Sequence, residues 1–133
     1  MSLQFSTAVR NARLAAIAAT IGASPKLMLY TGSPPANCAA AATGTLLATE
    51  TLPATWMNAA SGGSATQANG PWTGVDSVAG QAGYFRIMDS GQTTCHIQGT
   101  VGQGSGDLSF DNDTFAVGQN LQETSFTETD GNA

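Results

Sequence analysis

Few residues of this 133-residue chain have side chains suited to acid–base or metal chemistry. His96 is the single histidine, so no site with two histidine ligands can form within one chain. Cys95 directly precedes His96, and adjacent residues of a strand point to opposite faces of a sheet, so the two are not expected to act as a thiol–imidazole pair. We therefore predict neither catalytic nor cofactor-binding residues.

Acidic residues gather toward the C-terminus, where Asp107, Asp111 and Asp113 resemble calcium ligands in type. Their spacing is not that of an EF-hand, and no glutamate follows at the distance that would supply a bidentate ligand. The Asp-Asn-Asp sequence at 111–113 is in the first place a turn signal. We therefore predict no metal site here and interpret the acidic residues as a solvated surface.

The composition indicates a folded protein with an apolar core and few charges. Hydrophobic residues make up 41% of the chain and charged residues only 10%, against about 25% in an average soluble domain. A polar surface with few charges is cheap to desolvate, because burying a hydroxyl or an amide costs far less than burying an ion. Such a surface suits packing against other proteins, although a β domain that merely tolerates few charges would have the same composition.

Two classes of partner are not expected. The chain has four basic and nine acidic residues, and four basic residues cannot follow a phosphate backbone, so we predict no nucleic-acid binding. No segment approaches the roughly 20 apolar residues of a membrane span. The apolar stretch Leu14–Ile21 has helical spacing and is interpreted as mature structure rather than a signal peptide. Without a secretory signal, Cys38 and Cys95 are expected to be thiols, although they could pair.

A helix is predicted over about residues 6–22. Ser6 is a suitable N-cap, Gly22 a suitable residue to end the helix, and Pro25 follows as a stop. The apolar residues fall on two faces: Phe5, Ala8, Val9, Ala12, Ala16 and Ala19 on one, and Leu14, Ile17, Ala18 and Ile21 on the other. A helix that is apolar on two sides is either deeply buried or sandwiched between its own domain and a neighbour. The small alanine side chains would let another backbone come close, which favours the second arrangement.

After the helix, the hydrophobic period changes from 3.6 to 2, which is typical of strands. We expect strands near residues 26–31, 45–52, 83–89, 94–101, 108–110, 114–117 and 120–129. Two weaker candidates are a short strand that begins at 56–57 and one near 71–74. The strands at 83–89 and 94–101 should form a hairpin, and the Leu121-to-Phe126 spacing needs a bulge or a change of face. Seven or eight short antiparallel strands with one N-terminal helix fit a β-sandwich or jelly roll, as a single domain over residues 1–133.

Large aromatic side chains could line a sugar-binding face, and the candidates are Trp56, Trp72, Tyr30 and Tyr84. In a glycine-rich β domain, such residues are more often core or interface anchors. Trp72 lies in the glycine-rich segment 59–83. It is our best candidate for a residue that is buried only in an assembly.

Several segments, taken in order, resemble the small virion structural proteins of tailed bacteriophages. The helix SLQFSTAVRNARLAAI leads into LMLYTGSPPANCAAAATGTLLATETL, and AGYFRIMDSGQTTCHIQGTVG and GDLSFDNDTFAVGQNLQETSFTET follow. The resemblance covers nearly the whole chain, contains no catalytic signature, and is greatest to capsid cement (decoration) proteins. It implies β-sandwich or jelly-roll dimers or trimers on the outside of the head, assembled in the host cytoplasm, which bridge neighbouring major capsid proteins.

The residues that we expect at such an interface are Phe5, Val9, Leu14, Ile17, Trp56 and Trp72, together with backbone at strand edges. A tail or head–tail junction component is the first alternative function. The second is a carbohydrate-binding module exposed on the virion, in which Trp72 would carry the binding.

Overall fold

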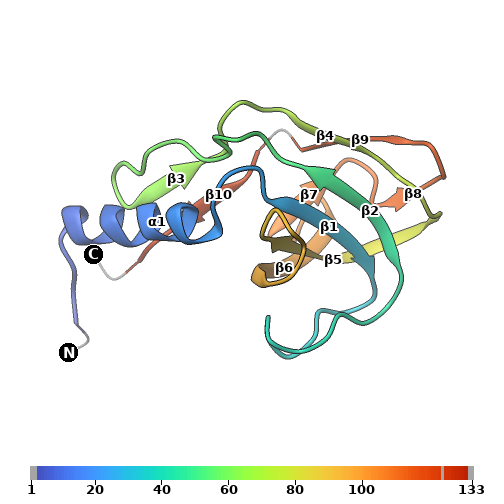
Figure 1. Cartoon of the computed structure of the whole chain (residues 1–133), viewed down its shortest axis with the longest axis horizontal. Coiled ribbons are helices and arrows are strands. Elements are labelled where there is room, and N and C mark those ends of the chain that lie inside the picture. Colours follow the sequence, from blue (N-terminus) through green and yellow to red (C-terminus); the bar gives the residue numbers. More distant parts are fainter. Residues whose placement is uncertain (1–2, 124, 132–133) are drawn as a thin grey trace.

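The computed structural model describes residues 3–123 and 125–131, and it contains one helix followed by ten strands (Figure 1). The elements are α1 (Thr7–Ile21), β1 (Lys26–Thr31), β2 (Leu46–Thr51), β3 (Ser64–Thr66), β4 (Trp72–Val75), β5 (Gly80–Met88), β6 (Cys95–Gln103), β7 (Leu108–Phe110), β8 (Thr114–Phe115), β9 (Asn120–Glu123) and β10 (Thr127–Thr129). The prediction of a mainly β protein with an N-terminal helix is confirmed.

The ends of α1 follow from its capping residues. The Ser6 hydroxyl accepts a hydrogen bond from the backbone N–H of Val9 at 3.2 Å, as expected of an N-cap. Gly22 has φ +88°, which favours glycine, and its N–H donates to the carbonyl of Ala18 at 3.0 Å. These contacts bear out the predicted helix over about residues 6–22.

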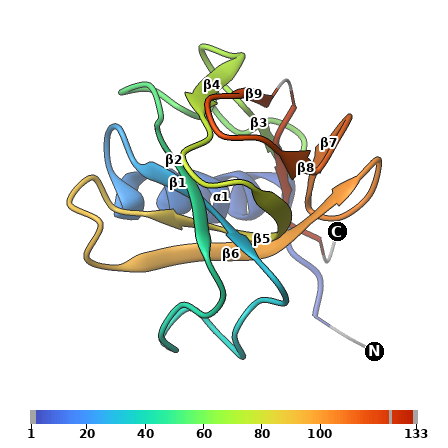
Figure 2. The ribbon, with the colours of Figure 1, turned by 90° about the vertical axis from the view of Figure 1, so that its right-hand side faces the viewer.

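The main sheet has six strands, in the order β2-β1-β5-β6-β7, and β8 pairs with the first part of β5. All pairs in it are antiparallel except β6 with β7, which is parallel. Two further ribbons, β4–β9 and β3–β10, complete the strands. The sheet curls beneath the β4–β9 ribbon, and the β3–β10 ribbon lies alongside α1 (Figures 1 and 2).

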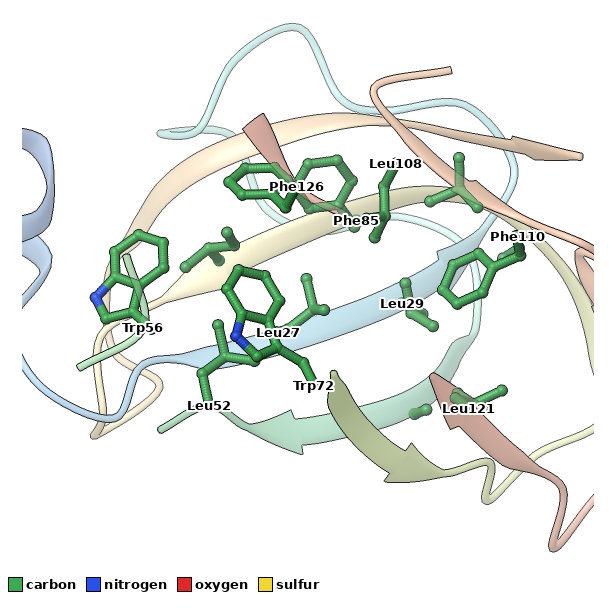
Figure 3. Close-up of a cluster of buried hydrophobic side chains, with 14 of the residues drawn as sticks. Leu27, Leu29, Leu52, Trp56, Trp72, Phe85, Leu108, Phe110, Leu121 and Phe126 are labelled. Atoms are coloured by element: carbon green, nitrogen blue, oxygen red, sulfur yellow. The ribbon is translucent and has the colours of Figure 1, made fainter. Parts of the chain in front are cut away.

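The main core lies between the curled sheet and the two ribbons (Figure 3). Trp72 is at its centre, with its ring 6.2 Å from the ring of Trp56 and 5.6 Å from that of Phe126. Phe85 of β5 meets Phe126 edge to face at 6.1 Å. These aromatic contacts join the sheet to the loop before β3 and to the segment before β10, which fixes both ribbons over the sheet.

A smaller apolar cluster covers the opposite face of the sheet. Tyr30 of β1 and Tyr84 of β5 stack with their ring centroids 5.0 Å apart, next to Met28. The Tyr84 hydroxyl donates to the carbonyl of Thr43 at 2.6 Å and accepts from its N–H at 3.0 Å. Through these bonds, the loop 32–45 between β1 and β2 is held against this face.

Three strand predictions need correction. The number of strands is ten, and not seven or eight, because the glycine-rich segment contains β3 and the predicted strand over 120–129 is divided. Its first part, β9, pairs with β4, and its second part, β10, pairs with β3. Residues 56–57 form only an isolated bridge, between Met57 and Gln67. The β5–β6 hairpin and the strand at 26–31 are confirmed.

Candidate interaction surface

Helix α1 is attached to the β3–β10 ribbon by polar contacts from one turn of the helix. Nη1 of Arg10 donates to the carbonyl of Asp130 at 3.0 Å, and Nε of Arg13 lies 3.0 Å from Oδ2 of the same residue. The amide oxygen of Asn11 accepts from the N–H of Gly63 at 2.9 Å. Because these partners come from the ribbon next to the helix, the helix is held in place along its N-terminal half (Figure 1).

The C-terminal half of the helix is attached through its apolar residues. Leu14 and Ile21 are buried, and Ile17 and Ala18 pack half-buried against the core. The indole N–H of Trp56 donates to the carbonyl of Gly22 at 3.1 Å, which satisfies a backbone group at the helix end. This is the second of the two apolar faces that the sequence indicates.

The first apolar face is exposed to solvent. Its exposed residues are Ala8, Val9, Ala12, Ala16 and Ala19, and Ala15 adjoins them. Val9 is 43% exposed. None of these side chains carries a charge, and the helix beneath them is fixed by the contacts described above. The outward face of α1, defined by these six residues, is therefore a pre-formed apolar surface on a rigid element.

A shallow groove of about 430 Å³ runs along one border of this face. It lies between α1 and the segment 57–60, and alanines form much of its wall: Ala12, Ala15, Ala18, Ala59, Ala60 and Ala65. Because alanine side chains are short, a partner that contacts the outward face of α1 can also reach into this groove. The face and the groove together form the candidate interaction surface.

The six predicted interface residues do not lie on one surface. Val9 is exposed, and the ring of Phe5 is half-buried, with the guanidinium carbon of Arg13 5.0 Å from its centroid. Ile17 lies on the side of α1 that packs against the core and is half-buried. The other three, Leu14, Trp56 and Trp72, are at most 3% exposed and belong to the core of the single chain. Of the six, only Val9 lies on the outward face of α1 with an exposed side chain.

The expectation that Trp72 is buried only in an assembly is wrong. Its side chain is 2% exposed within one chain, and its indole N–H donates to the carbonyl of Ala68 at 3.1 Å. A sugar-binding face built on the tryptophans is also wrong, since Trp56 is equally buried. Tyr30 and Tyr84 stack on each other under the loop 32–45, so they do not offer an open ring either.

The interior contains a pair of carboxyl groups that the sequence interpretation missed. Glu50 of β2 and Glu123 of β9 are each 1% exposed, and their carboxyl groups are neighbours that influence each other's titration. No described group donates a hydrogen bond to their four oxygens. Burial, followed by the neighbouring carboxyl group of Glu123 and its charge, raises the pKa of Glu50 to about 10. Burial also raises the pKa of Glu123.

This carboxyl pair is closed to any substrate. Glu50 lies against Gly74 of β4, where an added Cβ would come within 2.2 Å of its Cγ. With its pKa raised to about 10, Glu50 holds its proton at neutral pH. The sequence signal for the pair is weak: Glu50 falls in phase with the buried residues Ala48 and Leu52, and its neighbours Thr49 and Thr51 are exposed.

Of the three C-terminal aspartates that resemble calcium ligands in type, Asp107 and Asp111 are exposed and Asp113 is buried. Asp107 accepts hydrogen bonds from the N–H of Thr100 at 2.9 Å and from its hydroxyl at 3.0 Å. Asp113 lies within 3.4 Å of the amide nitrogen of Gln81. Across residues 3–123 and 125–131, no group of three or more His, Cys, Asp or Glu side chains is placed to hold a metal ion.

Within the same part of the chain, no helix is long and apolar enough to cross a membrane. Comparison of the sequence with protein-family models, and of the chain with curated proteins and solved structures, finds no match.

Proposed function

We propose that the protein is a non-enzymatic structural protein of a tailed-bacteriophage virion. Its most specific role would be that of a capsid cement protein, which binds the outside of the head and stabilises contacts between major capsid proteins. The observation that carries this proposal is the outward face of α1, an apolar and uncharged surface on a helix fixed to its own domain. The resemblance of the sequence to virion proteins suggests the partner, which is the major capsid protein.

The outward face is suited to close packing. Helices approach each other to 8–10 Å according to the size of the side chains at the contact, so a face of alanines allows a short distance. Little desolvation energy opposes the contact, because no charge is buried. One such contact is modest, but many copies on a symmetric shell add their contributions through avidity.

The placement of the residues with reactive side chains supports a role in packing rather than in catalysis. Glu50 and Glu123 are enclosed in the core. In the described part of the chain, no hydrogen bond joins the side chains of Cys95 and His96. We propose that the chain needs no cofactor. We also propose that it self-associates as a dimer or trimer, with the curled sheet and the β4–β9 ribbon as the two layers of a β-sandwich or jelly roll.

The number of copies per particle tests this role. Virions of the phage that encodes the chain are purified and their proteins quantified against the major capsid protein. A cement protein is present in hundreds of copies, in line with the symmetry of the shell, whereas a tail or junction component is present in about a dozen or fewer. Absence of the protein from purified heads contradicts the proposal.

A further inference from the structure

The loop 32–45 is fixed to the β5–β6 hairpin by two side chains from neighbouring strands. Nη2 of Arg86, a residue of β5 that is 4% exposed, donates to the carbonyl of Ala40 at 2.7 Å. Nε2 of Gln98, which lies opposite Arg86 on β6, donates to the carbonyl of Pro35 at 2.7 Å. The middle of the loop therefore has a defined position over the two strands (Figure 2).

Cys38 lies in this fixed part of the loop. The side-chain oxygen of Asn37 accepts from the N–H groups of Ala39 and Ala40 at 2.9 and 3.0 Å, which closes a turn around Cys38. Cys95 begins β6 three residues before Gln98 and lies opposite Met88 of β5, on the strand pair that the loop covers. Cys38 is among the neighbouring groups that raise the pKa of its thiol. Both residues are half-buried, and no disulfide joins them.

We propose that Cys38 and Cys95 form an intramolecular disulfide when the chain meets a low-molecular-weight disulfide such as oxidised glutathione. The thiolate of Cys38 attacks one sulfur of the oxidant, which gives a mixed disulfide and releases one thiolate. Cys95 then loses its proton and attacks the Cys38 sulfur, which forms the protein S–S bond and releases the second thiolate. Two protein thiols lose two electrons and two protons, and the oxidant becomes two thiols.

The environment of the pair determines when the bond forms. Burial, followed by the side-chain hydrogen bond with Cys38, raises the pKa of Cys95 to about 12. Closure is therefore slow at neutral pH and becomes faster as the pH rises, because the thiolate is the attacking species. In a reducing compartment the two residues stay as thiols, and in an oxidising medium they pair. The bond then locks the loop 32–45 onto β6.

The test uses the full chain, purified in the reduced form and incubated with a mixture of oxidised and reduced glutathione at mildly alkaline pH. We expect both thiols to disappear together, the intact mass to fall by two hydrogens, and a Cys38–Cys95 linked peptide to be found in a monomeric product. The melting temperature should rise by roughly 5–15 °C, because the new bond closes a long loop.

A matched control moves one thiol within the same loop. The double variant Cys38→Ser/Ala41→Cys keeps two thiols but places one at an exposed position. It should acquire glutathione adducts and no internal disulfide. The single variants Cys38→Ser and Cys95→Ser report on folding, and the peptide map of the unaltered chain decides the proposal even if they unfold.

Three results would overturn the proposal. The first is stable glutathione adducts on Cys38 and Cys95 separately in the unaltered chain. The second is a disulfide between two molecules in place of the internal one. The third is a pair of thiols that stays free at a glutathione ratio that modifies position 41 of the control.

Discussion

Glu50 and Glu123 come from strands that do not pair with each other, yet their carboxyl groups are neighbours in the core. Both side chains are 1% exposed, and no positively charged residue is among the causes that shift either pKa. Two neighbouring carboxylates without a counter-charge repel each other in a medium of low dielectric constant, so the folded state favours the protonated form of Glu50.

The pair predicts that the free energy of unfolding falls as the pH rises. The pKa of Glu50 is raised from 4.5 in its ordinary environment to about 10 in the folded chain. The unfolded state therefore releases its proton first, stability is complete below about pH 4.5, and it declines as the pH rises toward about 10. Burial shifts the pKa of Glu123 in the same direction. Urea unfolding at acidic, neutral and alkaline pH measures the slope.

Glu50→Gln should remove most of this slope. Glutamine keeps the size of the side chain without a proton that can be lost, so we expect the variant to be more stable than the unaltered chain at alkaline pH by about 1–4 kcal/mol. Gln122→Glu is the matched control, because it adds a carboxylate at an exposed position of β9 and should leave the slope unchanged. Stability that rises with pH in the unaltered chain would contradict the account of the pair.

Gly74 is predicted to be required for the space that Glu50 occupies. An added Cβ would lie 2.2 Å from Cγ of Glu50, and the enclosed side chain has little room to move. We expect Gly74→Ala to lower the free energy of unfolding by about 1–3 kcal/mol. Gly91→Ala is the matched control, because its Cβ would meet nothing closer than 3.8 Å. Equal stabilities of the two variants in urea would contradict this packing.

Trp72 is predicted to stabilise the single chain. Truncation to alanine leaves a cavity between Trp56 and Phe126, so Trp72→Ala should cost about 3–5 kcal/mol in urea unfolding of the isolated protein. Val117→Ala, at a side chain that is 67% exposed, should change stability by less than about 0.5 kcal/mol. If Trp72→Ala left the isolated protein as stable as Val117→Ala does, the core position of Trp72 would be contradicted.

The sequence predicts those parts of the fold that local residues determine. Ser6 and Gly22 mark the ends of α1, and the alternating pattern of residues 26–31 marks β1, because capping and side-chain alternation act within a few residues. The division of residues 120–129 into β9 and β10 depends on pairing with β4 and β3, which lie far earlier in the chain.

The candidate surface was predictable in part for the same reason. The two apolar faces of α1 follow from its spacing, and the structure assigns one to the core and one to solvent. The burial of Trp72 could not be predicted, because the strand expected at 71–74 lies within a glycine-rich segment and the contacts that bury the side chain come from Trp56 and Phe126. The contact of Glu50 with Glu123 likewise depends on how the β4–β9 ribbon lies over the sheet.

We propose that the outward face of α1 binds the capsid, and reconstitution tests this binding most directly. Heads from a phage lacking the gene are mixed with the purified chain or with Ala12→Glu/Ala16→Glu, which places two charges on that face. Ala79→Glu/Ala116→Glu, at two exposed alanines away from the helix, is the matched control. All three proteins should have similar melting temperatures, since the substitutions are on the surface.

Quantification of bound protein after sedimentation of the heads gives the answer. We predict that the unaltered chain and the Ala79→Glu/Ala116→Glu control bind in hundreds of copies per head, and that Ala12→Glu/Ala16→Glu loses binding. Equal binding of all three proteins would contradict the assignment of the interface to α1, and binding by none of them would contradict the cement role itself.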